Sequence, residues 1–283
     1  MSSAEALASM PFVFRTSEFC ARAGIEPSSA SRALRAAAAD GSVSRVVRGL
    51  WQRNDREPPV ADCYSSHPFA PAWMNTSECL MDAVFGRGPR RISRMTALDA
   101  AGVPLVAWPQ LSFPHESAGT SLPGRITVFR ERADRVCLFA ARLTERTWMS
   151  SGTRAAIEIA QHQRAAPSWD VRIAWALADG GTMFDVEEAV EIGEALQMRA
   201  GLRRVASIED ALRRLAADAP DGCLDDVPGE WADAVTARRG DTWIRLHPSL
   251  RRPREPSDAA WVDRERKVLW RRHPESLVAA LLT

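Results

Sequence analysis

The sequence predicts an α+β protein, with an N-terminal winged helix-turn-helix followed by a larger mixed α+β domain. Three observations predict this fold class. Residues 14–53 have the order helix, turn, helix and hairpin, short strand-like pieces fill residues 104–143, and residues 147–216 have helical periodicity. A chain of 283 residues is long enough for two domains.

Capping and turn residues set the bounds of the two helices in the helix-turn-helix. Thr16 is a good N-cap for the first helix, which Gly24 ends. Pro27 opens the second helix, because its missing N–H is unpaired at that position anyway. Asp40 and Gly41 stop the second helix, since glycine readily takes the left-handed conformation that follows a helix.

The two faces of the second helix differ in chemistry. At about 100° per residue, one face is apolar and should pack inward, with the members Ala30, Ala33, Leu34 and Ala37. The opposite face is small, hydroxylated and cationic, with Ser28, Arg32 and Arg35 on it and Ser29 and Ser31 at its flanks. Small residues allow a helix to enter a DNA major groove, where Ser and Arg bind phosphates and base edges.

The hairpin that follows adds positive charge. Val43–Val47 and Leu50–Arg53 are predicted strands, joined by a tight turn. Three of its arginines are placed to contact a DNA backbone or a minor groove: Arg45, Arg48 and Arg53. Residues 15–53 hold seven Arg against three carboxylates, a local surplus in a chain whose net charge is +1.

This charge pattern predicts binding to double-stranded DNA. The contacts would come from both helices and the hairpin, through Thr16, Ser28, Ser29, Ser31, Arg32, Arg35, Arg45, Arg48 and Arg53. The alternative is that these arginines form an ordinary solvated face, and that the three-helix unit only mediates protein contacts.

A leading helix and a proline-rich segment mark the ends of this N-terminal unit. Residues 1–13 are expected to form a short helix, whose Leu7 and Met10 help to cover the core. Residues 58–71 are rich in proline and indicate a linker or an extended crossing strand. The predicted domains are therefore 1–56 and 57–283.

The second domain is predicted to begin with a helix from residue 76 or 77 to Phe85. A second candidate basic patch follows, which could meet DNA, an acidic partner surface or water, and consists of Arg87, Arg90, Arg91 and Arg94. Ile92–Pro104 contains a predicted helix that Gly102 ends, and residues 104–143 are expected to form a small, mostly antiparallel sheet.

The remainder of the chain is predicted to be helical, with a closing α+β segment. Four amphipathic helices are expected at residues 153–163, 171–178, 185–198 and 207–216, the last of them capped by Ser207. Residues 241–283 are expected to form two strands and a short helix, around which three tryptophans pack: Trp243, Trp261 and Trp270.

Composition and motifs exclude several classes of function. The N-terminus has no basic region before an apolar stretch, and no run reaches the length of a membrane span, so we expect a cytoplasmic protein without a membrane partner. Five scattered Cys without a CxxC pair indicate reduced thiols. HxxxH, GxSxG, P-loop and GxGxxG motifs are absent, so we expect no catalytic residue, no metal site and no cofactor.

Three segments carry a resemblance to a known family. The first segment is the N-terminal unit, where the matching residues are Phe14, Thr16, Phe19, Ala21–Gly24, Ser31–Leu34, Asp40-Gly41, Val46 and Arg48–Trp51. The second is Ile92–Pro104, with Thr96-Ala97-Leu98 and Ala101-Gly102-Val103, and the third is Gly201–Leu212. These segments resemble the AbiEi family of abortive-infection antitoxins, although Ala101 stands where that family often has His.

The resemblance implies a function. AbiEi-family proteins are transcriptional repressors paired with a nucleotidyltransferase toxin, so this chain would repress its own promoter by binding inverted repeats, as a homodimer on DNA. Its partner would be a cognate nucleotidyltransferase-like toxin. The sequence leaves two alternative functions open. The first is a stand-alone winged-helix regulator whose second domain senses a ligand or a protein, and the second is a nucleic-acid-processing enzyme. A neighbouring nucleotidyltransferase-like gene would favour the antitoxin.

Overall fold

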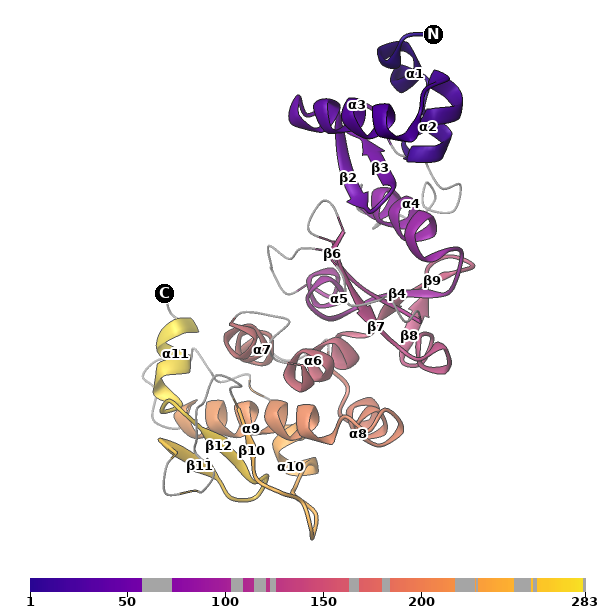
Figure 1. Ribbon diagram of the computed structural model, residues 1–283. Coiled ribbons are helices and arrows are strands. Elements are labelled where there is room, and N and C mark those ends of the chain that lie inside the picture. The colour runs from indigo at the N-terminus through magenta and orange to yellow at the C-terminus, as the bar shows by residue number, and fades with distance from the viewer. Residues whose placement is uncertain are drawn as a thin grey trace. The chain divides into compact units, whose positions relative to one another are not determined.

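The computed structural model describes residues 1–57, 73–102, 109–114, 121–122, 126–162, 168–179, 184–216, 227, 229–246, 256 and 259–281, with the backbone alone for 73–77, 278, 280 and 281. The protein is mixed α+β, as predicted (Figure 1). It divides into two compact units, of which the first holds residues 1–91, 108–136 and 142–148, and the second holds residues 92–107, 137–141 and 149–283. The predicted domain boundary near residue 57 adjoins residues 58–72, which lie outside the described residues, and it stays a prediction.

Three helices open the first unit: α1 (Ser3–Ala8), α2 (Thr16–Ala23) and α3 (Pro27–Ala39). A capping box starts α1, since Ser2 Oγ accepts a hydrogen bond from Glu5 N at 3.2 Å and Ser2 N donates one to Glu5 Oε2 at 2.7 Å. Gly24 ends α2 with a left-handed φ of 66°, and Pro27 is the first residue of α3. Both of these bounds confirm the prediction.

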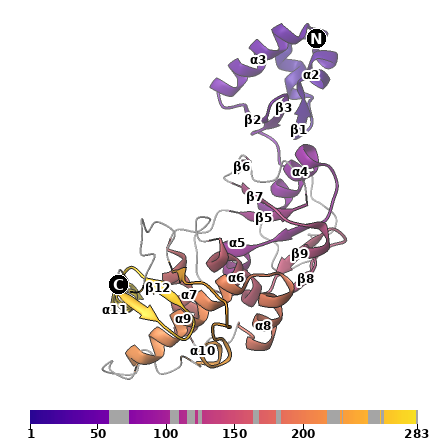
Figure 2. The same ribbon diagram turned by 60° about the horizontal axis from the view of Figure 1, so that its bottom comes forward.

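A three-stranded antiparallel sheet in the order β1-β3-β2 accompanies these helices. β2 (Val43–Val47) and β3 (Leu50–Arg53) are the predicted hairpin, and β1 (Val13–Arg15) pairs with β3. The sequence does not predict β1, because a three-residue strand is too short to show an alternating pattern. The order helix, strand, helix, helix and hairpin is compatible with the predicted winged helix-turn-helix. In both views α3 lies beside the β2–β3 hairpin (Figure 1 and Figure 2).

The core of this N-terminal part takes side chains from each of its helices and strands. From α3 it takes Ala30 and Leu34, neither of which has any exposed surface. Ala37 is buried and Ala33 is half-buried against the same core. The inner face of α3 is therefore the one that the sequence predicts, and its outer face is fixed by the same packing.

A six-stranded sheet in the order β6-β7-β5-β4-β9-β8 follows in the chain. It is preceded by α4 (Trp73–Phe85), and its strands are β4 (Arg90–Ile92), β5 (Gln110–Phe113), β6 (Ser121–Leu122), β7 (Ile126–Arg130), β8 (Ala140–Arg142) and β9 (Thr147–Ser150). β6 and β7 are antiparallel, but β5 and β7 are parallel. The expectation of a mostly antiparallel sheet misses this pair, because strand direction depends on the connections and not on the alternation of residues.

The helices of the second unit gather around α9 (Arg199–Ala216), which packs against α6 (Gly152–Gln161), α7 (Trp169–Ala178), α8 (Val186–Ala195) and α10 (Glu230–Ala234). The short helix α5 (Arg94–Ala100) packs against α6, and Gly102 follows its end as predicted. Gly201 allows α9 to approach α6 closely, because a Cβ at this position would lie 2.4 Å from Ile157 O.

The start of α9 corrects a prediction. The helix begins at Arg199 and not at Ser207, which is buried in the middle of the helix and accepts a hydrogen bond from Trp270 Nε1 at 3.0 Å. The first half of the helix does not read as amphipathic in the sequence, because Arg203 and Arg204 are charged residues at positions that face the protein. Both side chains donate hydrogen bonds to backbone carbonyl groups. Arg203 donates to Arg266 O at 2.6 Å, and Arg204 donates to Arg245 O at 2.7 Å.

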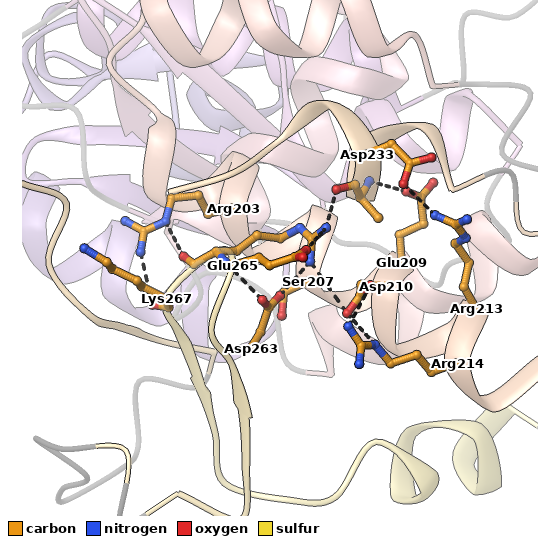
Figure 3. A network of polar contacts seen from close by, with 12 residues as sticks. Arg203, Ser207, Glu209, Asp210, Arg213, Arg214, Asp233, Asp263, Glu265 and Lys267 are labelled. Atoms are coloured by element: carbon orange, nitrogen blue, oxygen red, sulfur yellow. Dashed lines mark hydrogen bonds and ion pairs between the residues drawn. The ribbon is translucent and has the colours of Figure 1, made fainter. Parts of the chain in front are cut away.

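The C-terminal strands bind to α9 through polar side chains (Figure 3). They are β10 (Ile244–Arg245), β11 (Trp261–Asp263) and β12 (Val268–Trp270), one strand more than predicted, and α11 (Glu275–Leu281) follows them. Arg266 is buried, and its Nη1 lies 3.1 Å from Asp263 Oδ2 and 3.6 Å from Asp210 Oδ2 of α9. Glu209 accepts a hydrogen bond from Ala232 N at 2.6 Å, and burial raises the pKa of this carboxyl. Trp261 and Trp270 pack edge to face, as expected, with ring centroids 5.2 Å apart.

We predict that the two faces of α3 respond differently to truncation. Leu34→Ala should lower the free energy of unfolding of the N-terminal part by about 2–5 kcal/mol, because it leaves a cavity in the core. Arg35→Ala, one residue further along, should change it by less than about 0.5 kcal/mol, since Arg35 is exposed. Hydrogen exchange of residues 1–57 in increasing urea measures both. Equal effects would mean that the helix is rotated from this arrangement.

Candidate nucleic-acid interface

The outer face of α3 carries polar side chains that point away from the core. Ser28, Arg32 and Arg35 are exposed, and Ser29 and Ser31 at the flanks are half-buried. The remaining exposed side chains in the second half of the helix are alanines. The face is therefore narrow enough to enter a groove, and its two long side chains are both cationic.

The hairpin presents two further arginines. Arg45 is exposed in β2, and Arg48 is exposed in the turn, where Gly49 takes a left-handed φ of 80°. Gly49 O accepts a hydrogen bond from Thr16 N at 2.9 Å, which ties the turn to the start of α2. The position of Arg48 thus depends on a backbone contact with the neighbouring helix.

These four arginines keep their charge available for a ligand. Within the described ranges, no hydrogen bond or ion pair engages the guanidinium groups of Arg32, Arg35, Arg45 or Arg48. The nearby Asp40 carboxylate is occupied by Ser42, whose N donates to it at 2.9 Å and whose hydroxyl donates at 2.5 Å. The bond from the Ser42 hydroxyl lowers the pKa of Asp40 below its ordinary value.

Thr16 is not the N-cap of α2 that the sequence predicts, and its side chain instead contacts the hairpin. It is the first helical residue of α2, after Arg15, and Arg15 N donates to Glu18 Oε2 at 2.6 Å. The half-buried Thr16 Oγ1 accepts a hydrogen bond from Trp51 Nε1 at 3.0 Å and donates to Gly49 O at 3.4 Å. Its hydroxyl therefore holds the hairpin against α2.

Arg53 does not belong to the interface that the sequence predicts. Its side chain is buried, with 6% exposed, and donates to the carbonyl oxygens of Ala8 and Met10 at the end of α1. It also pairs with Asp55, with Nε 2.8 Å from Oδ1, and this bond lowers the pKa of the Asp55 carboxyl. The sequence does indicate this pairing, because Asp55 stands two residues after Arg53.

The second basic patch does not form as a surface. Arg87 is exposed, but Arg90 and Arg91 have no exposed surface and Arg94 has 8%. Arg90 pairs with Asp82 of α4, and Arg91 lies 2.6 Å from Glu131. The prediction fails because β4 is an interior strand of the six-stranded sheet, where an arginine must be paired to be buried.

Two further arginines of the N-terminal part are exposed, and the sequence does not predict either as a site residue. Arg15 stands at the N-cap of α2, and Arg22 in its last turn. Helical periodicity alone does not indicate their exposure, because the buried Phe19 lies four residues from Arg15 and three residues from Arg22, on the same side of the helix.

The described ranges hold no group of three or more His, Cys, Asp or Glu arranged to bind a metal ion. The helices that the structure describes include none that is both long enough and apolar enough to cross a membrane. No protein-family model matches this chain, and no curated protein is significantly similar to it.

We predict that Arg53 stabilises the fold, whereas Arg48 does not. Arg53→Ala should lower the free energy of unfolding of the N-terminal part by about 1–3 kcal/mol, because two carbonyl groups and a carboxylate lose a charged donor. Arg48→Ala removes the same charge from an exposed turn and should cost less than about 0.5 kcal/mol. Hydrogen exchange of residues 1–57 compares the two variants, and similar values would contradict the buried placement of Arg53.

Proposed function

We propose that the N-terminal part of this chain binds double-stranded DNA in a sequence-specific manner, and that the protein is a transcriptional repressor. The observation that carries the proposal is the set of exposed arginines on α3 and the hairpin, none of which is engaged by another described residue. Arg90 and Arg91, which are also adjacent in the chain, are instead buried and paired with carboxylates.

The roles of the two elements follow from their shapes. A helix of about 12 Å diameter fits a major groove of similar width, so α3 would present Arg32 and Arg35 to base edges. The hairpin carries Arg45 on β2 and Arg48 in its turn, so these two side chains would lie along the phosphate backbone. Base contacts supply sequence preference, whereas phosphate contacts supply affinity that salt weakens.

The proposal extends to an antitoxin that represses its own operon. Its support is the resemblance of the N-terminal unit, Ile92–Pro104 and Gly201–Leu212 to AbiEi-family antitoxins. In this reading a homodimer binds inverted repeats, and residues 57–283 counter a nucleotidyltransferase-like toxin. In the structure Gly201–Leu212 lies within α9, and many of its residues are buried. Burial alone would therefore favour the same spacing of apolar residues, without a family relationship.

Variants of α3 and the hairpin test DNA binding. Arg32→Ala and Arg35→Ala should each weaken operator binding by about 1–3 kcal/mol and relax the preference at one position, because a base contact is lost. Arg48→Ala should weaken all sequences alike and lower the salt dependence, because a phosphate contact is lost.

Fluorescence anisotropy with an operator duplex and a scrambled duplex measures these effects. Arg239→Ala is the matched control, because it removes one exposed arginine from the second unit. Undiminished operator affinity in a folded Arg32→Ala, Arg35→Ala double variant would refute the proposed interface.

Fragments separate repression from antitoxicity. Residues 1–56 should bind operator DNA weakly, since a monomer contacts one half-site, and the full chain should prefer half-sites about 34–36 Å apart or a multiple of that distance. Residues 57–283 should not bind the operator but should rescue growth beside an adjacent nucleotidyltransferase gene. Binding of the operator by residues 57–283 would contradict the repressor. Failure to rescue growth would favour the ligand-sensing regulator over the antitoxin.

A further inference from the structure

The composition of α3 limits which bases it can read. The helix consists only of Pro, Ser, Ala, Arg and Leu, in the order PSSASRALRAAAA. Its only long polar side chains are Arg32 and Arg35, and both are exposed on the outer face. We propose that each half-site of the operator contains two guanines, read in the major groove by these two arginines. This inference rests on the proposed function and adds the identity of the bases.

Each base presents its own pattern of donors and acceptors in the major groove. Guanine offers two acceptors in the major groove, O6 and N7, which match the paired donors of a guanidinium group. Adenine is matched by the amide of Asn or Gln, and the amino group of cytosine by a carboxylate. α3 contains no Asn, Gln, Asp or Glu, so it has no side chain that would prefer adenine or cytosine.

Serine and alanine do not change this preference. The hydroxyl groups of Ser28, Ser29 and Ser31 can donate or accept, so they fit several bases and the phosphates equally. Alanine methyl groups can contact only the methyl group of thymine. The specific hydrogen bonds of the helix are therefore assigned to arginine.

The spacing of the two arginines sets the spacing of the guanines. Three residues of a helix advance about 4.5 Å along its axis, and successive base pairs are about 3.4 Å apart. Arg32 and Arg35 are both exposed on one side of α3. The two guanines should therefore lie within about three base pairs of each other, on either strand.

Both guanidinium groups are available for this contact. No other described residue forms a hydrogen bond or an ion pair with them, unlike Arg53, which is close in sequence but bound to Asp55 and two carbonyl groups. The nearest carboxylate after the helix, that of Asp40, is held by Ser42. Desolvation of the two arginines by DNA thus breaks no contact within the protein.

Selection from a randomised duplex pool tests the base preference with the full chain. The enriched motif should contain two G·C pairs within about three base pairs of each other in each half-site. An enriched motif without guanine would overturn this inference and leave sequence-specific DNA binding intact. The absence of any binding or enrichment would instead overturn the proposed function itself.

Modified bases then test the groove and the residue. Replacing one of the two guanines by 7-deazaguanine removes the N7 acceptor and should weaken wild-type binding on the order of tenfold. Replacing the same guanine by inosine removes only the minor-groove amino group and should have no effect.

Arg32→Ala and Arg35→Ala should each become insensitive to 7-deazaguanine at one position, and the two positions should differ. Arg48→Ala should remain sensitive at both. Loss of binding with inosine, or equal 7-deazaguanine sensitivity in all variants, would overturn the assignment to α3 in the major groove.

Discussion

The packing of one face of α3 is the constraint on which the rest of this account depends. Leu34 and Ala30 have no exposed surface, and this burial fixes the rotation of the helix about its axis. A rotation of the helix would move Arg32 and Arg35 toward the core, where an unpaired charge is costly. The core therefore positions the interface, although no interface residue forms part of it.

The arginines that the structure describes occupy two distinct kinds of surroundings, buried polar networks and exposed surface. Lys267 is the only lysine, so almost every positive charge is a guanidinium group, whose five donors suit buried networks as well as DNA. Arg266 is buried between Asp263 and the carbonyl of Ala232, and Arg154 pairs with Glu158 within α6. Such groups offset the cost of burying charge by using several donors. A count of arginines along the sequence therefore overestimates the charge that a ligand could meet.

Local signals predicted the N-terminal elements, whereas distant contacts decided which predictions failed. Pro27 and Gly24 set the bounds of two helices by backbone preference alone, and the period of α3 placed Leu34 in the core. The role of Arg91 depends on Glu131, forty residues later, so no local pattern could show that it is buried. The start of α9 differs from the prediction for the same reason, because the carbonyls of Arg266 and Lys267 that accept from Arg203 lie in the turn between β11 and β12. The outer face of α3 was predictable because its exposure follows from the helical period and needs no partner from elsewhere in the chain.

The most direct measurement of the central claim locates DNA on the surface of the protein. A photo-crosslinking amino acid at Ser28, on the outer face of α3, should link to duplex DNA, because this face would lie in the major groove. The same group at Ala4, exposed on α1, should link much less. High-salt competition should remove both signals together with binding. Equal linking from the two positions, or linking from Ala4 alone, would contradict the account.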